Sequence, residues 1–163
     1  MKTRQSIIST LLFIMILVLG SQVTAGEKFF QASFFSPIQI QPEGEIISGF
    51  RFNLLYGRQA TVKGLDLGLV NHTTTGMSKG VQWGMVNYTD ASFLGLQHGL
   101  VNVTMQDFEG FQWGFVNYSH KANGFQLGFV NYAHTLHGLQ IGLVNIIKQG
   151  GQFPVFPIVN WSF

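Results

Sequence analysis

GFQLGFVN, at residues 124–131, is one of six near-copies of a single eight-residue phrase. The others are GLDLGLVN (64–71), GVQWGMVN (80–87), GLQHGLVN (95–102), GFQWGFVN (110–117) and GLQIGLVN (138–145). Their first glycines, at positions 64, 80, 95, 110, 124 and 138, lie 14 to 16 residues apart. A tandem repeat this regular indicates one small structural unit that is used many times.

Within each copy, large apolar residues alternate with small or polar ones. In the copy at 124–131, Phe125, Leu127 and Phe129 share one parity, and glycine and Gln126 occupy the other. Successive side chains of a strand point to opposite faces, so the phrase predicts a strand with a large apolar face and a narrow face. An uninterrupted strand also places Asn131 on the apolar face. A helix would need apolar residues at three- and four-residue spacing, which the copies lack.

Besides a valine at the seventh position, the first glycine, the second glycine and the final asparagine recur in every copy of the phrase. Glycine on a narrow face indicates close approach of another backbone, and a polar residue there is expected to hydrogen-bond with its counterparts on neighbouring strands. We therefore interpret these positions as structural. They are Gly64, Gly68, Asn71, Gly80, Gly84, Asn87, Gly95, Gly99, Asn102, Gly110, Gly114, Asn117, Gly124, Gly128, Asn131, Gly138, Gly142 and Asn145.

The first 25 residues have the pattern of a secretory signal peptide. Lys2 and Arg4 precede a mainly aliphatic run at residues 7–19, and small residues at 23–25 offer a cleavage site. The alternative is an uncleaved anchor, although the run is short for a membrane-spanning helix, which needs about 20 residues. We expect residues 26–163 to form a single β-repeat domain.

Charge and cysteine content exclude several classes of function. The chain has 9 Lys and Arg against 7 Asp and Glu, and two of the basic residues lie in the predicted signal peptide. The processed chain is then formally neutral, so its basic isoelectric point does not indicate a nucleic-acid partner. The chain has no cysteine, which excludes disulfides, thiolate metal sites and cysteine nucleophiles.

Two all-β architectures fit the repeat. The first is an antiparallel meander of about eight to ten strands, closed or nearly closed as an outer-membrane-type barrel, with the apolar face toward lipid. The near-symmetry of the phrase and the aromatic C-terminus at Phe163 favour it. His98 in the apolar band, a band too thin for a bilayer, and prolines in the last strand weigh against it. The alternative is a β-solenoid, in which each repeat is one coil and like residues stack in ladders.

The tandem G-[LF]-Q-x-G-[LF]-V-N phrase behind an export signal resembles a family of uncharacterised bacterial surface-repeat proteins. The resemblance covers residues 49–163. It implies a cell-surface or outer-membrane setting and supplies no reaction, ligand or catalytic residue. Asn53, Asp66 and Pro157 depart from the pattern.

No set of residues has the spacing of a known catalytic or metal site. His134 and His137 would lie on opposite faces of a strand, and Ser119, His120 and Asp107 form a hydrolytic combination only if loops bring them together. The Asn-x-Ser/Thr triplets that follow several copies are generated by the repeat itself. We therefore predict no catalytic, cofactor-binding or metal-binding residues and no cofactor.

The sequence predicts a non-enzymatic bacterial cell-surface or outer-membrane protein with a structural or surface-interaction role. The alternative is a secreted, soluble β-solenoid that acts as a binding module, and a small outer-membrane barrel enzyme is a third hypothesis. Membrane lipid is the expected partner and nucleic acid is not. The expected location is the outer membrane or cell surface, with secretion or the periplasm as the alternative.

Overall fold

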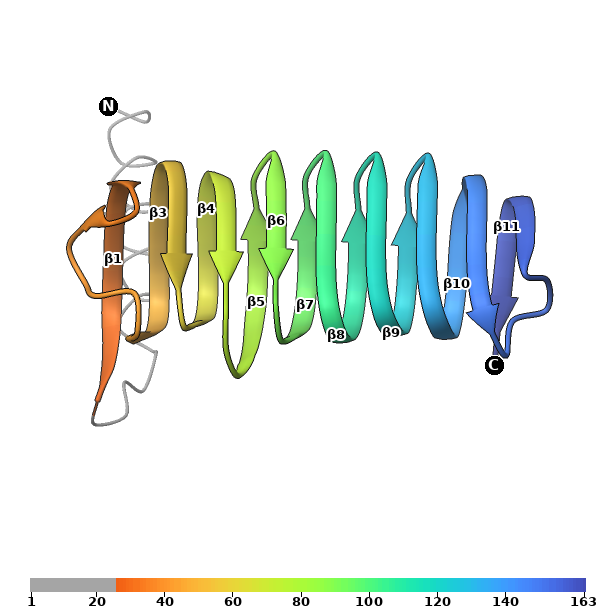
Figure 1. The fold of residues 1–163 in the computed structure, drawn as a ribbon, viewed down its shortest axis with the longest axis horizontal. Coiled ribbons are helices and arrows are strands. Elements are labelled where there is room, and N and C mark those ends of the chain that lie inside the picture. The colour runs from red at the N-terminus through yellow and green to blue at the C-terminus, as the bar shows by residue number, and fades with distance from the viewer. Residues whose placement is uncertain (1–25) are drawn as a thin grey trace, which may run out of the picture.

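The chain forms a β-solenoid of about eight turns, with 79% of the described residues in strands and none in helices. This computed structural model describes residues 26–163, and the predicted signal peptide lies outside them. Figure 1 shows the coils stacked side by side along one straight axis, each as a flattened loop with a tight upper bend and a wider lower turn. Within residues 26–163 no helix is long and apolar enough to cross a membrane.

Eleven strands make up one continuous sheet. In chain order they are β1 (Glu27–Phe35), β2 (Ile38–Gln39), β3 (Ile46–Gln59), β4 (Thr61–Thr73), β5 (Met77–Trp83), β6 (Val86–Thr89), β7 (Ser92–His98), β8 (Val101–Trp113), β9 (Val116–Leu127), β10 (Val130–Gln149) and β11 (Val155–Ser162).

The predicted antiparallel barrel is wrong, because neighbouring strands from β3 to β10 run parallel. Each copy of the phrase pairs with the next residue for residue, so that Gly124 lies opposite Gly138 and Gln126 opposite Gln140. Parallel register stacks identical side chains, which lets each amide donate to the same amide one coil away. The prediction failed because buried and exposed residues alternate in the same way in parallel and antiparallel sheets, and because the nearly symmetric phrase does not show the direction of its neighbour.

A bend at the second glycine interrupts the strands in four of the six copies of the phrase, whereas β4 and β10 continue through Gly68 and Gly142. In four coils the chain bends at residues 84–85, 99–100, 114–115 and 128–129. The bend shifts the alternation by one residue, so Val130 lies outside and Asn131 is fully buried. The prediction that Asn131 shares a face with Phe125 is therefore wrong. One phrase supplies the end of one strand, the bend and the start of the next strand.

The interior of the solenoid is narrow and largely polar. Rows of glutamine, asparagine and Thr or Ser fill most of it, and a small apolar cluster lies along the lower part: Phe93, Phe108, Ala122, Ala133, Leu136 and Ile147. The first glycine of each phrase is required by coil spacing. A Cβ on Gly124, whose φ is +131°, would lie 2.1 Å from the carbonyl oxygen of Gly110.

Both ends of the stack depart from the repeat. At the start, β3 is a degenerate coil, because Gly49 pairs with Gly64 while Asn53 takes the place of the second glycine. At the end, β11 pairs antiparallel with β10, so Asn160 lies opposite Gln140 rather than continuing the coil. The chain reverses through Gly150 and Gly151 before Pro154.

Candidate functional site: an apolar edge

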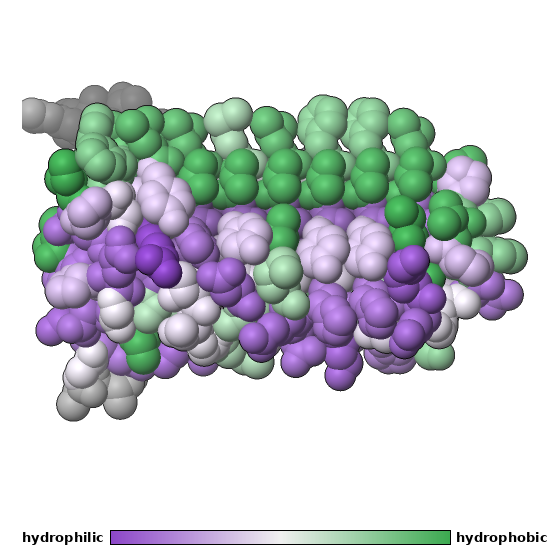
Figure 2. All heavy atoms as spheres, in the orientation of Figure 1, coloured by the Kyte–Doolittle hydropathy of each residue, from purple (hydrophilic) through white to green (hydrophobic). Residues whose placement is uncertain are grey.

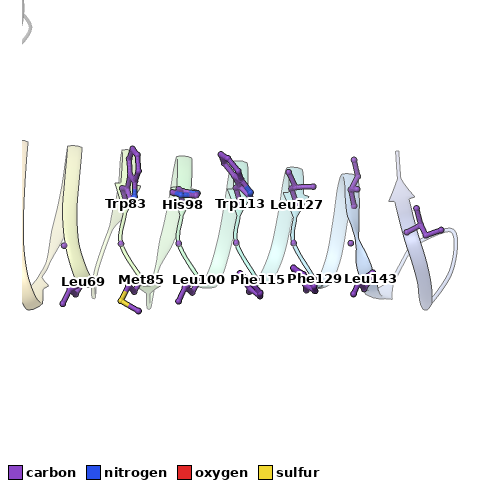
Figure 3. A pocket seen from close by; sticks show the side chains of 18 residues that line it. Leu69, Trp83, Met85, His98, Leu100, Trp113, Phe115, Leu127, Phe129 and Leu143 are labelled. Atoms are coloured by element: carbon purple, nitrogen blue, oxygen red, sulfur yellow. The ribbon is translucent and has the colours of Figure 1, made fainter.

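A groove runs along the upper bends of the solenoid, parallel to its axis. Its volume is about 870 Å³. Its floor is the row of second glycines: Gly68, Gly84, Gly99, Gly114, Gly128 and Gly142. Adjacent coils are spaced by about 4.8 Å, so these six glycines span roughly 24 Å. Figure 3 shows this row between two walls of side chains.

The two walls come from the residues on either side of each glycine. One wall is Trp83, His98, Trp113, Leu127 and Ile141, and the other is Leu69, Met85, Leu100, Phe115, Phe129 and Leu143. Trp83 is 58% exposed and Phe115 is 53% exposed, although both are large and apolar. Because water-exposed apolar patches of this extent mark interaction sites, the groove and its walls are the candidate binding surface.

Two further apolar rows extend this surface down both sides of the molecule. Beyond the Leu/Phe wall lie Val70, Val86, Val101, Val116, Val130 and Val144, and beyond the Trp wall lie Leu65, Val81, Leu96, Phe111, Phe125 and Leu139. We call the two walls, the glycine floor and these flanking rows the apolar edge. Figure 2 shows its upper part as a hydrophobic band along the top of the molecule.

The buried asparagines hold the edge in shape. Asn117 Nδ2 donates to Asn131 Oδ1 at 2.8 Å and to the carbonyl oxygen of Leu127 at 2.9 Å. The same pair of bonds recurs from Asn71 through Asn131, each time to the wall residue of the next coil. Since the asparagine side chains are fully buried, their Asn-x-Ser/Thr triplets offer no accessible amide in the folded chain.

A second ladder of glutamines runs beside the asparagines. Gln97 donates to Gln82 at 2.8 Å, and the same bond links Gln112, Gln126 and Gln140 in turn. Gln82 donates to Asp66, where the ladder ends on a buried ion pair with Arg51 at 2.6 Å. The glutamines thus hydrogen-bond to their counterparts, and Arg51 and Asp66 supply a charged terminus for the row.

His98 is the one polar side chain among the wall residues. Its ring lies between Trp83 and Trp113, with centroids 5.2 and 4.6 Å away. Its Nδ1 is buried and has no hydrogen-bond partner. The sequence places this residue in an otherwise apolar band, and in the structure the coils on both sides of it carry Trp at the same position.

The other candidate residues are not brought together. Ser119 is buried and donates to Gln112 Oε1 at 3.0 Å, so its hydroxyl belongs to the interior ladder. The rings of His120 and His134 stack with centroids 4.8 Å apart, and the rings of His137 and Phe163 meet edge to face with centroids 6.5 Å apart. Among residues 26–163 no group of three or more His, Asp or Glu side chains is arranged to hold a metal ion.

One hydrogen-bonded chain of titratable side chains was not predicted from the sequence. Tyr56 lies 2.8 Å from His72 Nδ1, and His72 Nε2 lies 2.8 Å from Asp90. With a neutral imidazole, Nε2 donates to the carboxylate and Nδ1 accepts from the phenol. Burial raises the pKa of Tyr56, which keeps the phenol protonated as a donor. These residues lie in successive coils, so only knowledge of the parallel register would have brought them together.

Comparison of the chain with protein-family models, with curated proteins and with solved structures found no match. The family resemblance of the repeat therefore stays a prediction.

Proposed function

We propose that this protein is a non-enzymatic, exported β-solenoid that binds a partner through its apolar edge at the bacterial cell envelope. The observation that carries the proposal is the edge itself. Trp83, Trp113, Phe115, Phe129 and Leu143 are each more than half exposed. Exposing such side chains to water along the whole molecule is unfavourable unless a partner covers them.

The arrangement of polar groups supports a binding role over a catalytic one. The buried glutamine and asparagine side chains are engaged with one another or with backbone carbonyls, so they are occupied in holding the coils together. Catalysis needs an activated nucleophile, acid or base within reach of a substrate. The groove walls offer His98 alone among titratable side chains.

The envelope setting rests on the sequence of residues 1–25 and on the composition of the edge. We expect the processed protein to be retained by the cell envelope rather than released. The test is fractionation of the producing bacterium, comparing the wild type with Phe115→Lys/Phe129→Lys, which places two charges on the edge. The matched control is Asn123→Lys/His137→Lys, which adds lysines at two exposed positions of neighbouring coils outside the edge.

The proposal predicts that wild type and control stay with washed envelopes and that the edge variant is released. Release of all three proteins from washed envelopes, or retention of all three, would contradict a binding role for the edge. Circular dichroism of each variant checks that the β-fold persists.

A further inference from the structure

The apolar edge changes in polarity with distance from the bend. Leu69, Met85, Leu100, Phe115, Phe129 and Leu143 lie at the bend itself, and the valine row follows. The next outward row on that side is His72, Tyr88, Val103, Tyr118, Tyr132 and Ile146. On the other side, the apolar rows give way to Lys63, Lys79, Leu94, Glu109, Asn123 and His137. Apolar residues together with Trp83 and Trp113 lie at the tip, Tyr88, Tyr118 and Tyr132 lie on one flank, and charged or polar residues lie beyond the other flank. Polarity thus rises with distance from the tip, as it does from the hydrocarbon to the water across a membrane interface.

The depth of the apolar zone matches insertion into one leaflet. Phe125 lies three residues before Gly128, and Tyr132 lies four residues after it. At about 3.3 Å per residue, the apolar zone extends roughly 10 Å from the bend on each side. This is too shallow to cross a hydrocarbon core of about 30 Å. It equals the 5–10 Å or so to which interfacial elements bury their apolar face.

Most backbone N–H groups at the bends of the edge donate to carbonyl oxygens within the solenoid. Gly114 N donates to the carbonyl oxygen of Leu127 at 3.0 Å, and Phe115 N donates to that of Leu100 at 2.9 Å. Equivalent bonds serve the bends at residues 84–85 and 99–100, and Gly128 N donates to Ile141 in the same way. Backbone groups that enter hydrocarbon must be satisfied internally. The N–H groups at the bends of residues 84–85, 99–100 and 114–115 meet that requirement.

The shape of the edge favours a fluid partner over a second copy of the chain. The tip between the two walls is two residues wide, about 7 Å, and roughly 24 Å long, or about 170 Å². A stable dimer buries about 800 Å² on each partner. Two such edges placed tip to tip would leave the valine row and the Phe111/Phe125 row in water. Lipid tails can surround the tip and both flanks together.

We infer that the apolar edge inserts into the acyl region of a single lipid leaflet, with the solenoid axis parallel to the membrane plane. This inference rests on the proposed function and names lipid as the partner of the edge. The wide lower turns then face water. The residues just beyond the edge include both Lys79 and Glu109, so insertion depends on apolar contact rather than on charge.

The first test is flotation of the full chain with phosphatidylcholine vesicles, which carry no net charge. Wild type and Asn123→Lys/His137→Lys should float, also at about 1 M salt, where the screening length is about 3 Å. Phe115→Lys/Phe129→Lys should lose about tenfold or more in partitioning, because lysine is strongly unfavourable in hydrocarbon. Equal flotation of both variants would assign binding to another segment and overturn the inference.

The second test reports on the edge alone. Trp161→Phe leaves Trp83 and Trp113 as the remaining tryptophans of the chain. Their emission should be quenched by phosphatidylcholine brominated on its acyl chains, and acrylamide quenching should fall on vesicle addition. Emission unaffected by brominated lipid would overturn the inference. Sedimentation velocity without lipid tests self-association. If the wild type is a dimer and Phe115→Lys/Phe129→Lys is a monomer, the edge binds a second copy of the chain and the lipid inference is overturned.

Different results would overturn the lipid inference alone and the binding role of the edge as a whole. If the edge variant is released from envelopes in cells but the wild type does not float with vesicles, the edge binds a protein or polysaccharide and the lipid inference is wrong. If the edge variant also stays with envelopes, both the inference and the proposed function are wrong.

Discussion

A single asparagine serves three bonds in the interior ladder. Asn117 accepts from Asn102 at 2.9 Å and donates to both Asn131 and the Leu127 carbonyl. Asn117→Ala removes all three hydrogen bonds. Each buried donor or acceptor that is left without a partner destabilises the folded state by about 1–3 kcal/mol. We expect the free energy of unfolding to fall by about 3 kcal/mol, measured by urea denaturation. Asn123→Ala, at an exposed position, should change it by less than about 0.5 kcal/mol.

The buried ion pair at the start of the glutamine row allows a sharper experiment. Asp66 accepts from Arg51, from Asn53 and from Gln82. Asp66→Asn leaves the Arg51 charge buried and poorly compensated, so unfolding free energy should fall by about 3–5 kcal/mol. Arg51→Gln/Asp66→Gln extends the neutral ladder by two rungs, and it should be close to wild type in the same urea measurement. A double variant as unstable as Asp66→Asn would show that the charge pair itself is needed.

At the scale of the element, the bend depends on the second glycine. A Cβ on Gly128 would lie 2.4 Å from the carbonyl oxygen of Gly114 and 2.7 Å from the Asn117 side chain. Gly128→Ala must therefore push two coils apart, and overpacking of this kind costs about 1–3 kcal/mol. Gly44→Ala meets nothing within 4 Å and is the control. Equal thermal stability of the two variants would contradict the close packing of the bends.

The sequence predicted strands, and it could not predict how they pair. Alternation of Phe125, Gln126 and Leu127 records which side of a strand is buried, and this is the same for parallel and antiparallel neighbours. The bend was missed because glycine and Phe129 continue the alternation. The signal that the sequence offered was the pair of residues after Phe129. In a continuous strand the apolar Val130 would lie on the narrow face and the polar Asn131 on the apolar face, and this exchange of apolar and polar residues indicates a corner.

The candidate site was predictable only in part. Periodicity identified the large apolar residues, but it assigned them to the wall of a barrel. Their gathering on both sides of one edge follows from the bend, which brings Trp113 and Phe115 to opposite walls of one groove. The Tyr56, His72 and Asp90 chain was not predictable, because its members are neighbours only after the coils are stacked in parallel register.

At the scale of the whole molecule, a solenoid tolerates the loss of a complete coil. Gly95 and Gly110 occupy equivalent positions in adjacent coils, as do Leu94 and Glu109. Deleting residues 95–109 joins Leu94 to Gly110 and keeps every later ladder in register. Stability in such arrays is roughly a sum over coils and their interfaces. With about 5–15 kcal/mol shared among the coils of a domain, the deletion should lower unfolding free energy by about 1–2 kcal/mol.

Deletion of residues 95–102 provides the contrast, because it removes half a coil and places interior residues where exterior ones belong. The full-coil deletion should keep a β-type circular dichroism spectrum and a cooperative urea transition, and the half-coil deletion should lose both.

Shortening the stack by one coil also shortens the apolar edge by about 4.8 Å. Vesicle partitioning of the full-coil deletion should therefore weaken and yet persist, since five of the six second glycines that form the groove floor remain. A fold in which each strand is needed for closure would lose structure in both deletions, so equal unfolding of the two variants would contradict independent stacking of the coils.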